Sequence, residues 1–396
     1  MLAQRTALLN SSHTAAAWTA ITAAAASADQ IIDLSAEEIQ CELAPMVREG
    51  AMIAINRNMD QNTLTSDPTG LRKAIARKLS AETDQHWSAD EVAVTGGSSP
   101  ALFNVAMVLL DPGDEVLIPA PHWTAFPAQV LLIGGTPIFI ETRHNNYVPE
   151  LTDLASAVTS KTKAIVVNTP NNPTGSIYNR DTLAGIAQLA IERDLWIVFD
   201  ECYGAFAHAP YHHLPIVSVS PRARARTLIV NSFSKSLALA GWRIGYLAGP
   251  EPAIRAIRAL QSHTTYNPDA IAQHALLHHL ESADGGFQLK LQRHAADART
   301  LGLSILSTLR SIPQPAAEGG FHFYLDLSGW YRRVKGPGPE FDADEVANVL
   351  LMEAGIATAS GTVFGDPTGI RLSYGVDLIL LEKALRRLTV TLNTWK

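Results

Sequence analysis

The sequence has little cysteine, no long apolar run and no excess of basic residues. Its two cysteines, Cys41 and Cys202, cannot form a disulfide framework, and neither lies in a Cys-x-x-Cys pair. No uncharged apolar stretch reaches the roughly 20 residues that a membrane-spanning helix needs. The net charge of -7 provides no basic surface for nucleic acid. We therefore expect a cytoplasmic protein whose partners are small molecules and a second copy of itself.

The thirteen histidines do not make a metal site. His274 and His278 have the spacing of two ligands on one face of a helix. However, no His-Glu-x-x-His pattern is present, and no acidic residue lies between the two to serve as a base. The sequence thus predicts no bound metal.

From Val92 onward, short runs rich in β-branched residues alternate with helical patterns. Continuously apolar strands that alternate with helices predict a mainly parallel sheet covered on both faces. The expected strands are Val92–Thr95, Glu115–Pro119, Pro137–Glu141, Lys163–Asn168, Leu195–Asp200, Thr227–Asn231 and Ile244–Gly249.

The chain on either side of this region has a different pattern. Before it, helical spacing covers Met46 to Ile53 and Leu71 to Leu79. After it, a long helical region from Glu251 to about Leu309 leads to the runs FHFYLDL and RLSYG, which indicate a smaller α+β domain. We expect residues 1–49 to form an N-terminal arm and part of the small domain, 50–262 the large domain, and 263–396 the rest of the small domain.

The stretch SFSKSLALAGWRIG, Ser232 to Gly245, places Lys235 directly after an expected strand and shortly before Arg243. Such a lysine has two interpretations. It is either a loop residue with a solvated charge, or an amine whose pKa is lowered by burial and cationic neighbours. An amine of the second kind is a nucleophile toward carbonyl carbons. This stretch by itself leaves both interpretations open.

Other polar side chains follow the expected strands, at the edge where an open α/β sheet binds its ligand. Asp200 ends a buried strand and needs a cationic partner or a protonated nitrogen, because an unpaired buried carboxylate is costly. The segment TGGSSPA, Thr95 to Ala101, suits an anion bound at a helix N-terminus, and a plain tight turn explains it equally well. Asn172 lies in the turn-rich segment NTPNNPTG.

The polar groups expected at one sheet edge fit a ligand with a phosphate, a carbonyl and a ring nitrogen. These groups are a carboxylate, a lysine, an arginine, an asparagine and a hydroxyl-rich loop. Pyridoxal 5'-phosphate (PLP) has all three groups, and its enzymes use a covalently bonded lysine and an acidic partner for the ring nitrogen. From about Val92 to its end, the chain resembles the class I/II aminotransferase family, because these motifs occur together in that family's order.

The resemblance implies a fold-type I PLP enzyme. Its α/β fold would have a mainly parallel seven-stranded sheet in a large domain, with a smaller α+β domain beside it. PLP would be the cofactor, and the enzyme would be a homodimer. The activity would be amino transfer between an L-amino acid and a 2-oxo acid.

The resemblance also implies roles for individual residues. Lys235 would bond to PLP and move the Cα proton, Asp200 would hold the ring-nitrogen proton, and Tyr203 and Asn172 would bind the phenolic oxygen. Trp123 would stack on the ring. The phosphate would be bound by Ser98, Ser99, Ser232, Ser234 and Arg243. A core tyrosine, a turn asparagine and a core tryptophan are the competing interpretations of Tyr203, Asn172 and Trp123.

The remaining roles in the site concern the substrate. Arg371 would bind its α-carboxylate in two-pronged fashion, with Asn172 and Trp123 beside it. A surface salt bridge is the competing interpretation of Arg371.

The N-terminal part departs from the family. Where the family has a Gly-x-Pro stretch, this chain has Ala36, Glu37 and Glu38, and no tyrosine stands near Leu64 or Thr65, where the family has one. Glu37 is either a substrate contact for a cationic amino acid or a carboxylate at a helix start. Three hypotheses follow. The first is an aminotransferase, and the second is a PLP-dependent lyase or cyclase that performs β/γ-elimination, replacement or intramolecular cyclisation on an amino acid, with a cationic, arginine-like substrate as one case. The third is an inactive PLP-binding regulator.

Overall fold

The computed structural model describes residues 3, 31–59, 69–282, 285–336 and 342–395. A seven-stranded sheet forms its centre, in the strand order β2-β8-β7-β6-β5-β3-β4. The strands are β2 (Val92–Thr95), β3 (Glu115–Ala120), β4 (Thr136–Glu141), β5 (Thr162–Asn168), β6 (Trp196–Asp200), β7 (Thr227–Ser232) and β8 (Gly245–Ala248).

The sheet confirms the expected architecture. Strands β4, β3, β5, β6 and β7 pair in parallel, whereas β8 runs antiparallel to both β7 and β2. The seven predicted strands are all present, with ends that differ by about one residue. A mainly parallel sheet needs helical crossovers, and the sequence pattern between the strands supplies them.

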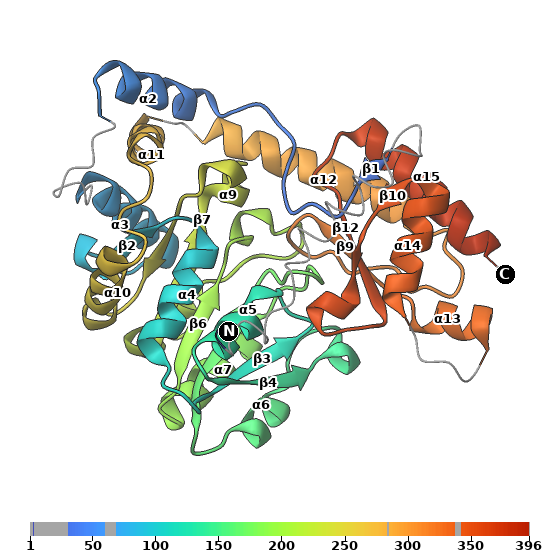
Figure 1. Cartoon of the computed structure of the whole chain (residues 1–396), viewed down its shortest axis with the longest axis horizontal. Coiled ribbons are helices and arrows are strands. Elements are labelled where there is room, and N and C mark those ends of the chain that lie inside the picture. Colours follow the sequence, from blue (N-terminus) through green and yellow to red (C-terminus); the bar gives the residue numbers. More distant parts are fainter. Residues whose placement is uncertain (1–2, 4–30, 60–68, 283–284, 337–341, 396) are drawn as a thin grey trace.

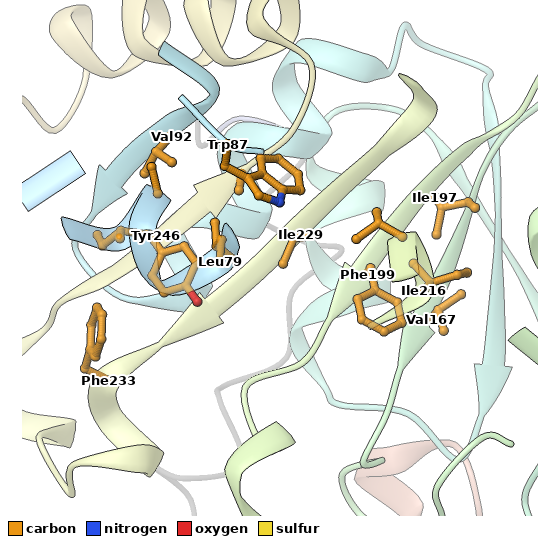
Figure 2. Close-up of a cluster of buried hydrophobic side chains, with 14 of the residues drawn as sticks. Leu79, Trp87, Val92, Val167, Ile197, Phe199, Ile216, Ile229, Phe233 and Tyr246 are labelled. Atoms are coloured by element: carbon orange, nitrogen blue, oxygen red, sulfur yellow. The ribbon is translucent and has the colours of Figure 1, made fainter. Parts of the chain in front are cut away.

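Both faces of the sheet are buried, which explains why its strands are continuously apolar. On one face Val167, Phe199 and Ile229 stand opposite one another on β5, β6 and β7. Figure 2 shows part of this core, together with Trp87 and Tyr246. The alternate residues, such as Val166 and Val198, point into a second core on the opposite face.

Helices cover the two faces separately (Figure 1). Each of the two cores receives side chains from its own helices. The helices that pack into the second core are α4 (Ser98–Leu109), α5 (Ala125–Leu132) and α10 (Glu251–His263). The helices that pack into the first core include α3 (Thr69–Thr83), α6 (Leu151–Ala157), α7 (Arg180–Glu192) and α8 (Ile216–Val219). Among the described residues, no helix is both long and apolar enough to cross a bilayer.

A separate core lies under a small antiparallel sheet, which matches the expected α+β part of the chain. Its strands are β9 (His322–Asp326), β11 (Ala359–Ser360) and β12 (Gly369–Ser373). Its helices are α12 (Gly286–Leu306), α13 (Ser328–Lys335), α14 (Ala343–Ala354) and α15 (Leu378–Thr394). The domain boundaries themselves stay a prediction.

The N-terminal arm joins this smaller part. Strand β1 (Ile32–Asp33) pairs in parallel with β10 (Ile356–Ala357). Leu34 is fully buried beside them, and its carbonyl accepts a hydrogen bond from the N–H of Ser373 at 2.7 Å. The arm is therefore fixed by backbone hydrogen bonds before it enters the first long helix.

That helix, α2 (Pro45–Asn56), crosses α11 (Ala270–Ser282) at close range. Gly50 makes the approach possible, because a Cβ atom at this position would lie 2.7 Å from the His278 Cβ and 2.8 Å from the Ala275 Cα. A backbone atom cannot move aside as a flexible side chain can. Any side chain at residue 50 must therefore push α2 away from α11.

We predict that Gly50→Leu lowers the free energy of unfolding by about 2 kcal/mol or more, since overpacking a tight contact forces backbone shifts. Arg48→Leu is the matched control, because Arg48 is exposed on the same helix. Urea denaturation of both variants measures the difference. Equal stability of the two variants would show that the α2 and α11 contact is loose.

Candidate active site

The ends of the central strands bring the polar residues together. Asn168, Asp200 and Ser232 are the last residues of β5, β6 and β7, which are parallel and adjacent. Strand β2 also runs in this direction, because β8 is antiparallel to both β2 and β7. Arg243 precedes β8 and therefore lies at the same edge of the sheet.

A cavity of about 530 Å³ opens at this edge. All but one of the predicted site residues line it, so side chains from the arm, the large sheet and the small sheet meet there. They are Glu37, Ser98, Ser99, Trp123, Asn172, Asp200, Tyr203, Ser234, Lys235, Arg243 and Arg371.

The exception is Ser232, which is buried behind the cavity wall. Its hydroxyl caps the short helix α9 (Phe233–Ser236) by accepting from the Ser234 N–H at 3.1 Å. The same hydroxyl lies 2.8 Å from the Ser234 hydroxyl. The structure therefore places Ser232 where it orients Ser234, and a direct contact of Ser232 with an anion stays a prediction.

Lys235 lies in α9, one turn past the end of β7, and its side chain is 13% exposed. Its Nζ donates to the backbone carbonyl of Glu37 and lies 5.3 Å from the centre of the Tyr203 ring. Burial lowers the pKa of the amine, and the Glu37 carboxylate opposes that shift. This environment favours the interpretation of Lys235 as a buried amine over that of a solvated loop charge.

Asp200 lies at the floor of the cavity. One carboxylate oxygen accepts from the Cys202 N–H at 3.0 Å, and no ion pair involves Asp200 within the described ranges. Burial raises the pKa of this carboxyl to about 6, against the hydrogen bond from Cys202. A carboxylate in such a place is stabilised by any protonated nitrogen brought to it.

Tyr203 and Trp123 complete the walls. The Tyr203 ring is 3% exposed, and its hydroxyl has no hydrogen-bond partner in the described part of the protein. Burial raises the pKa of this phenol well above its ordinary value, so it stays protonated and able to donate. Trp123 borders the cavity after β3 and packs edge-on against Phe126, with ring centroids 5.6 Å apart.

The start of α4 offers an anion site beside Arg243. Gly97 precedes the helix with φ of 105°, and a Cβ atom there would lie 2.6 Å from the Arg243 guanidinium. Glycine at this position thus lets the guanidinium approach the Ser98 and Ser99 backbone at the helix N-terminus. A guanidinium, hydroxyl groups and free helix N–H groups together suit a phosphate.

Arg371 of β12 approaches the cavity from the small sheet and is 2% exposed. Its Nη1 donates to Asn172 Oδ1 at 2.8 Å and to Glu37 Oε1 at 2.5 Å. Its Nη2 donates to the carbonyl of Ser35 at 2.7 Å. The chain's own groups therefore already bind both Nη groups of the guanidinium that the resemblance assigns to a substrate carboxylate, while Nε has no partner in the described part of the chain. This buried ion pair replaces the surface salt bridge considered above.

The altered arm thus enters the site itself. Glu37 lines the cavity. Its neighbour Glu38 also borders the cavity but is exposed, and Ala36 carries no polar side chain. The positions at which the family has its tyrosine, Leu64 and Thr65, lie outside the described residues.

His322 is a residue near the site that the sequence interpretation missed. It is fully buried, neither ring nitrogen has a partner within the described ranges, and its ring centroid lies 5.3 Å from that of Tyr203. Burial, together with Arg371, lowers its pKa well below the ordinary value. Its position in β9 opposite Ser373 makes it a diagonal neighbour of Arg371, which only the strand register reveals.

These features fit PLP. The unpartnered Tyr203 hydroxyl can donate to a phenolic oxygen, and the buried Asp200 can pair with a protonated ring nitrogen. Lys235 supplies a buried amine in the same cavity, and the start of α4 with Arg243 suits the phosphate.

Comparison with known proteins gives one family. The model of the family "Aminotransferase class I and II" matches residues 29–388. The chain is 32% identical over 389 residues to an aspartate aminotransferase of Bacillus sp. (strain YM-2), covering 98% of each.

Solved structures agree with this similarity. The aspartate aminotransferase of Thermus thermophilus with maleate has a TM-score of 0.90 and 33% identity, and the alignment covers 98% of this chain and 99% of that one. The Rhizobium meliloti aspartate aminotransferase has a TM-score of 0.93 and 27% identity over the full length of both chains.

We predict that Asp200→Asn stabilises the cofactor-free protein at neutral pH. The pKa of Asp200 rises from 3.8 to about 6 on folding, so ionisation of the folded protein costs stability as the pH rises through this window, and the cost is constant above it. The gain should be near zero below about pH 4 and about 2–3 kcal/mol above about pH 6.

Urea denaturation of the cofactor-free protein at several pH values measures this gain. Asp84→Asn is the control, because Asp84 is exposed, and its effect should not follow the same pH profile. A stability difference for Asp200→Asn that is equal at about pH 4 and about pH 8 would contradict the proposed burial cost.

Proposed function

The chain belongs to the aminotransferase class I and II family and is a PLP-dependent aminotransferase, and from this premise we propose a role for each side chain that lines the cavity. The observation that carries these roles is the convergence of Lys235, Asp200, Tyr203 and Arg371 on one cavity from separate elements. When bound, PLP supplies an aldehyde carbon for the amino group and a ring that withdraws electrons from the substrate Cα.

Lys235 is the residue that bonds to the cofactor and moves the proton at the substrate Cα. Burial lowers the pKa of its amine, which brings a general base closer to working pH. Asp200 holds the proton at the ring nitrogen. Tyr203 and Asn172 would hydrogen-bond the phenolic oxygen, and the Asn172 side chain also contacts Glu37 and Arg371.

The phosphate is held by Ser98, Ser99, Ser234 and Arg243, with Ser232 behind them as the cap of α9. Trp123 covers one face of the ring, since an indole supports a flat cofactor by stacking. Arg371 and Asn172 bind the α-carboxylate of the amino acid, and Trp123 forms the adjacent wall. The relatives carry aspartate in their names, so aspartate is the first amino donor to test.

We also propose a homodimer, in agreement with the sequence-based expectation. Met52 and Ile55 are 53% and 51% exposed and lie three residues apart on α2, so they share one outward face. Exposed apolar patches on a helix favour association, and twofold symmetry is the commonest closed assembly. The cytoplasmic location stays a prediction.

We predict that Lys235→Ala lowers the rate of amino transfer by at least about 10³-fold, because it removes both the bonding amine and the Cα base. Lys73→Ala on the exposed side of α3 is the control and should retain full activity. The assay follows conversion of bound PLP to pyridoxamine phosphate together with release of a 2-oxo acid, across a panel of L-amino acids.

Three other results would count against these roles. Activity of Lys235→Ala equal to that of the control would remove the role of Lys235. Release of ammonia without pyridoxamine phosphate would contradict amino transfer and favour the lyase hypothesis. An intact protein that binds PLP and turns over no amino acid would favour the regulator.

For the dimer, we predict that the double substitution Met52→Glu and Ile55→Glu shifts the protein toward the monomer, because it places two charges on the apolar face. Met352→Glu is the control, as Met352 is 59% exposed on α14. Analytical ultracentrifugation measures the mass. A mass unchanged by the double substitution would place the interface elsewhere.

A further inference from the structure

Glu37 is an anion held inside the cavity. Its carboxylate accepts from Arg371 Nη1 at 2.5 Å and from Asn172 Nδ2 at 3.1 Å, and its other oxygen lies 3.9 Å from Lys235 Nζ. Its side chain is 28% exposed. Burial works against ionisation of this group, but Arg371 and Lys235 outweigh it and hold the pKa of Glu37 below its usual range.

The arm that carries Glu37 is anchored on both sides. Leu34 N–H donates to the Ala357 carbonyl at 2.9 Å, and Gln40 N–H donates to the Gly375 carbonyl at 2.8 Å. A Cβ atom at Gly375 would lie 2.5 Å from the Glu38 carbonyl, so the arm packs directly on this glycine. The Glu37 side chain can therefore rotate while its backbone stays in place.

Most of the cations that line the cavity are assigned to the cofactor, and few are left for the substrate. Among the described lining residues, the cations are Lys235, Arg243 and Arg371. Lys235 and Arg243 serve the cofactor under the proposed function. For the substrate this leaves Arg371 as the single remaining cation of that described set.

The carboxylates on the substrate side outnumber that cation. Asp33, Glu37 and Glu38 all line the cavity, in addition to Asp200 at its floor. Asp33 is engaged with the Ser35 N–H and hydroxyl at 2.7 and 2.6 Å, and Glu38 is exposed. Glu37 is thus the carboxylate that directly opposes the arrival of another anion.

A substrate α-carboxylate must compete with Glu37 for Arg371. Both Nη groups of Arg371 are already bound, Nη2 to the Ser35 carbonyl and Nη1 to Asn172 and Glu37, and its buried Nε is the one guanidinium nitrogen without a partner among the described residues. Displacing Glu37 leaves a partly buried carboxylate without its cation, which is costly. A cationic group on the substrate side chain removes this cost, because it gives the displaced carboxylate a new partner.

We propose that the amino donor is an amino acid with a cationic side chain, an ammonium or a guanidinium, and that Glu37 is the residue that selects it. The proposal rests on the proposed function, since it takes the α-carboxylate to be bound at Arg371. When the donor binds, the ion pair between Glu37 and Arg371 is replaced by two others. The donor's carboxylate pairs with Arg371, and its side-chain cation pairs with Glu37.

Neutral and acidic donors do not fit this exchange. A neutral side chain leaves Glu37 unpaired, and an aspartate-like donor adds a second carboxylate where the described lining offers no second free cation. The relatives that are named for aspartate therefore share the fold and the chemistry with this chain without indicating its donor.

The test compares donors that are matched in shape and differ in charge. With the PLP-loaded enzyme, kcat/KM is measured for L-arginine against L-citrulline, for L-lysine against L-norleucine, and for L-aspartate. We expect the cationic member of each pair to be preferred by about 10- to 100-fold, as charge-assisted hydrogen bonds allow. Aspartate should be the poorest donor.

Variants assign the preference to Glu37. Glu37→Gln should reduce both ratios to near one, and Glu37→Asp should retain part of them because it keeps the charge. Glu42→Gln, at an exposed arm residue outside the cavity lining, should leave them unchanged. Aspartate or a neutral amino acid as the best wild-type donor would overturn the proposal. Ratios that survive Glu37→Gln would overturn the role of Glu37.

The outcomes separate this proposal from the proposed function. If wild-type enzyme transfers the amino group of aspartate or citrulline efficiently, the proposed function stands and the cationic donor is wrong. If no amino acid converts bound PLP to pyridoxamine phosphate, the proposed function fails and the cationic donor fails with it. If Glu37→Gln does not fold, the wild-type ratios and Glu37→Asp decide the question.

Discussion

The ion pair between Glu37 and Arg371 is the interaction on which the arrangement of the cavity depends. Its two residues are 334 positions apart in the sequence, and Asn172 after β5 and Lys235 in α9 contact the same carboxylate. A guanidinium that is 2% exposed must have its donors satisfied, because a buried unpaired charge is costly. The arm supplies Glu37 and the Ser35 carbonyl, and the segment after β5 supplies Asn172, whereas Nε of Arg371 has no partner among the described residues.

The central sheet imposes the second constraint. Because both of its faces are packed with apolar side chains, polar groups are tolerated only where the strands end. Asp200, Lys235 and Arg243 occupy such ends, and the parallel direction of β5, β6 and β7 places those ends at one edge. The same burial that stabilises the sheet raises the pKa of Asp200 and lowers that of Lys235, because it disfavours the charged form of each group.

Much of this arrangement could be predicted from the sequence. The strands alternate with helices strongly enough to fix their positions, and Lys235 and Asp200 follow strands whose direction is implied by the crossovers. The environment of Arg371 could not be predicted, because it depends on where the arm crosses the small sheet. The sequence showed that Glu37 stands in place of the family's Gly-x-Pro stretch, but spacing could not show that its carboxylate reaches Arg371. His322 was missed for a related reason, since its neighbours are set by strand register.

The two constraints act on different parts of the reaction. The sheet edge positions Lys235, Asp200, Tyr203 and the start of α4 with Arg243, to which the proposed function gives the cofactor and the Cα proton. The arm contributes little to the sheet, so its sequence can change without disturbing that chemistry. Yet the arm places Glu37 within 2.5 Å of the guanidinium that any α-carboxylate must reach. Family membership therefore reports how the amino group is moved, while under our proposal the charge of one arm residue decides from which amino acid it is taken.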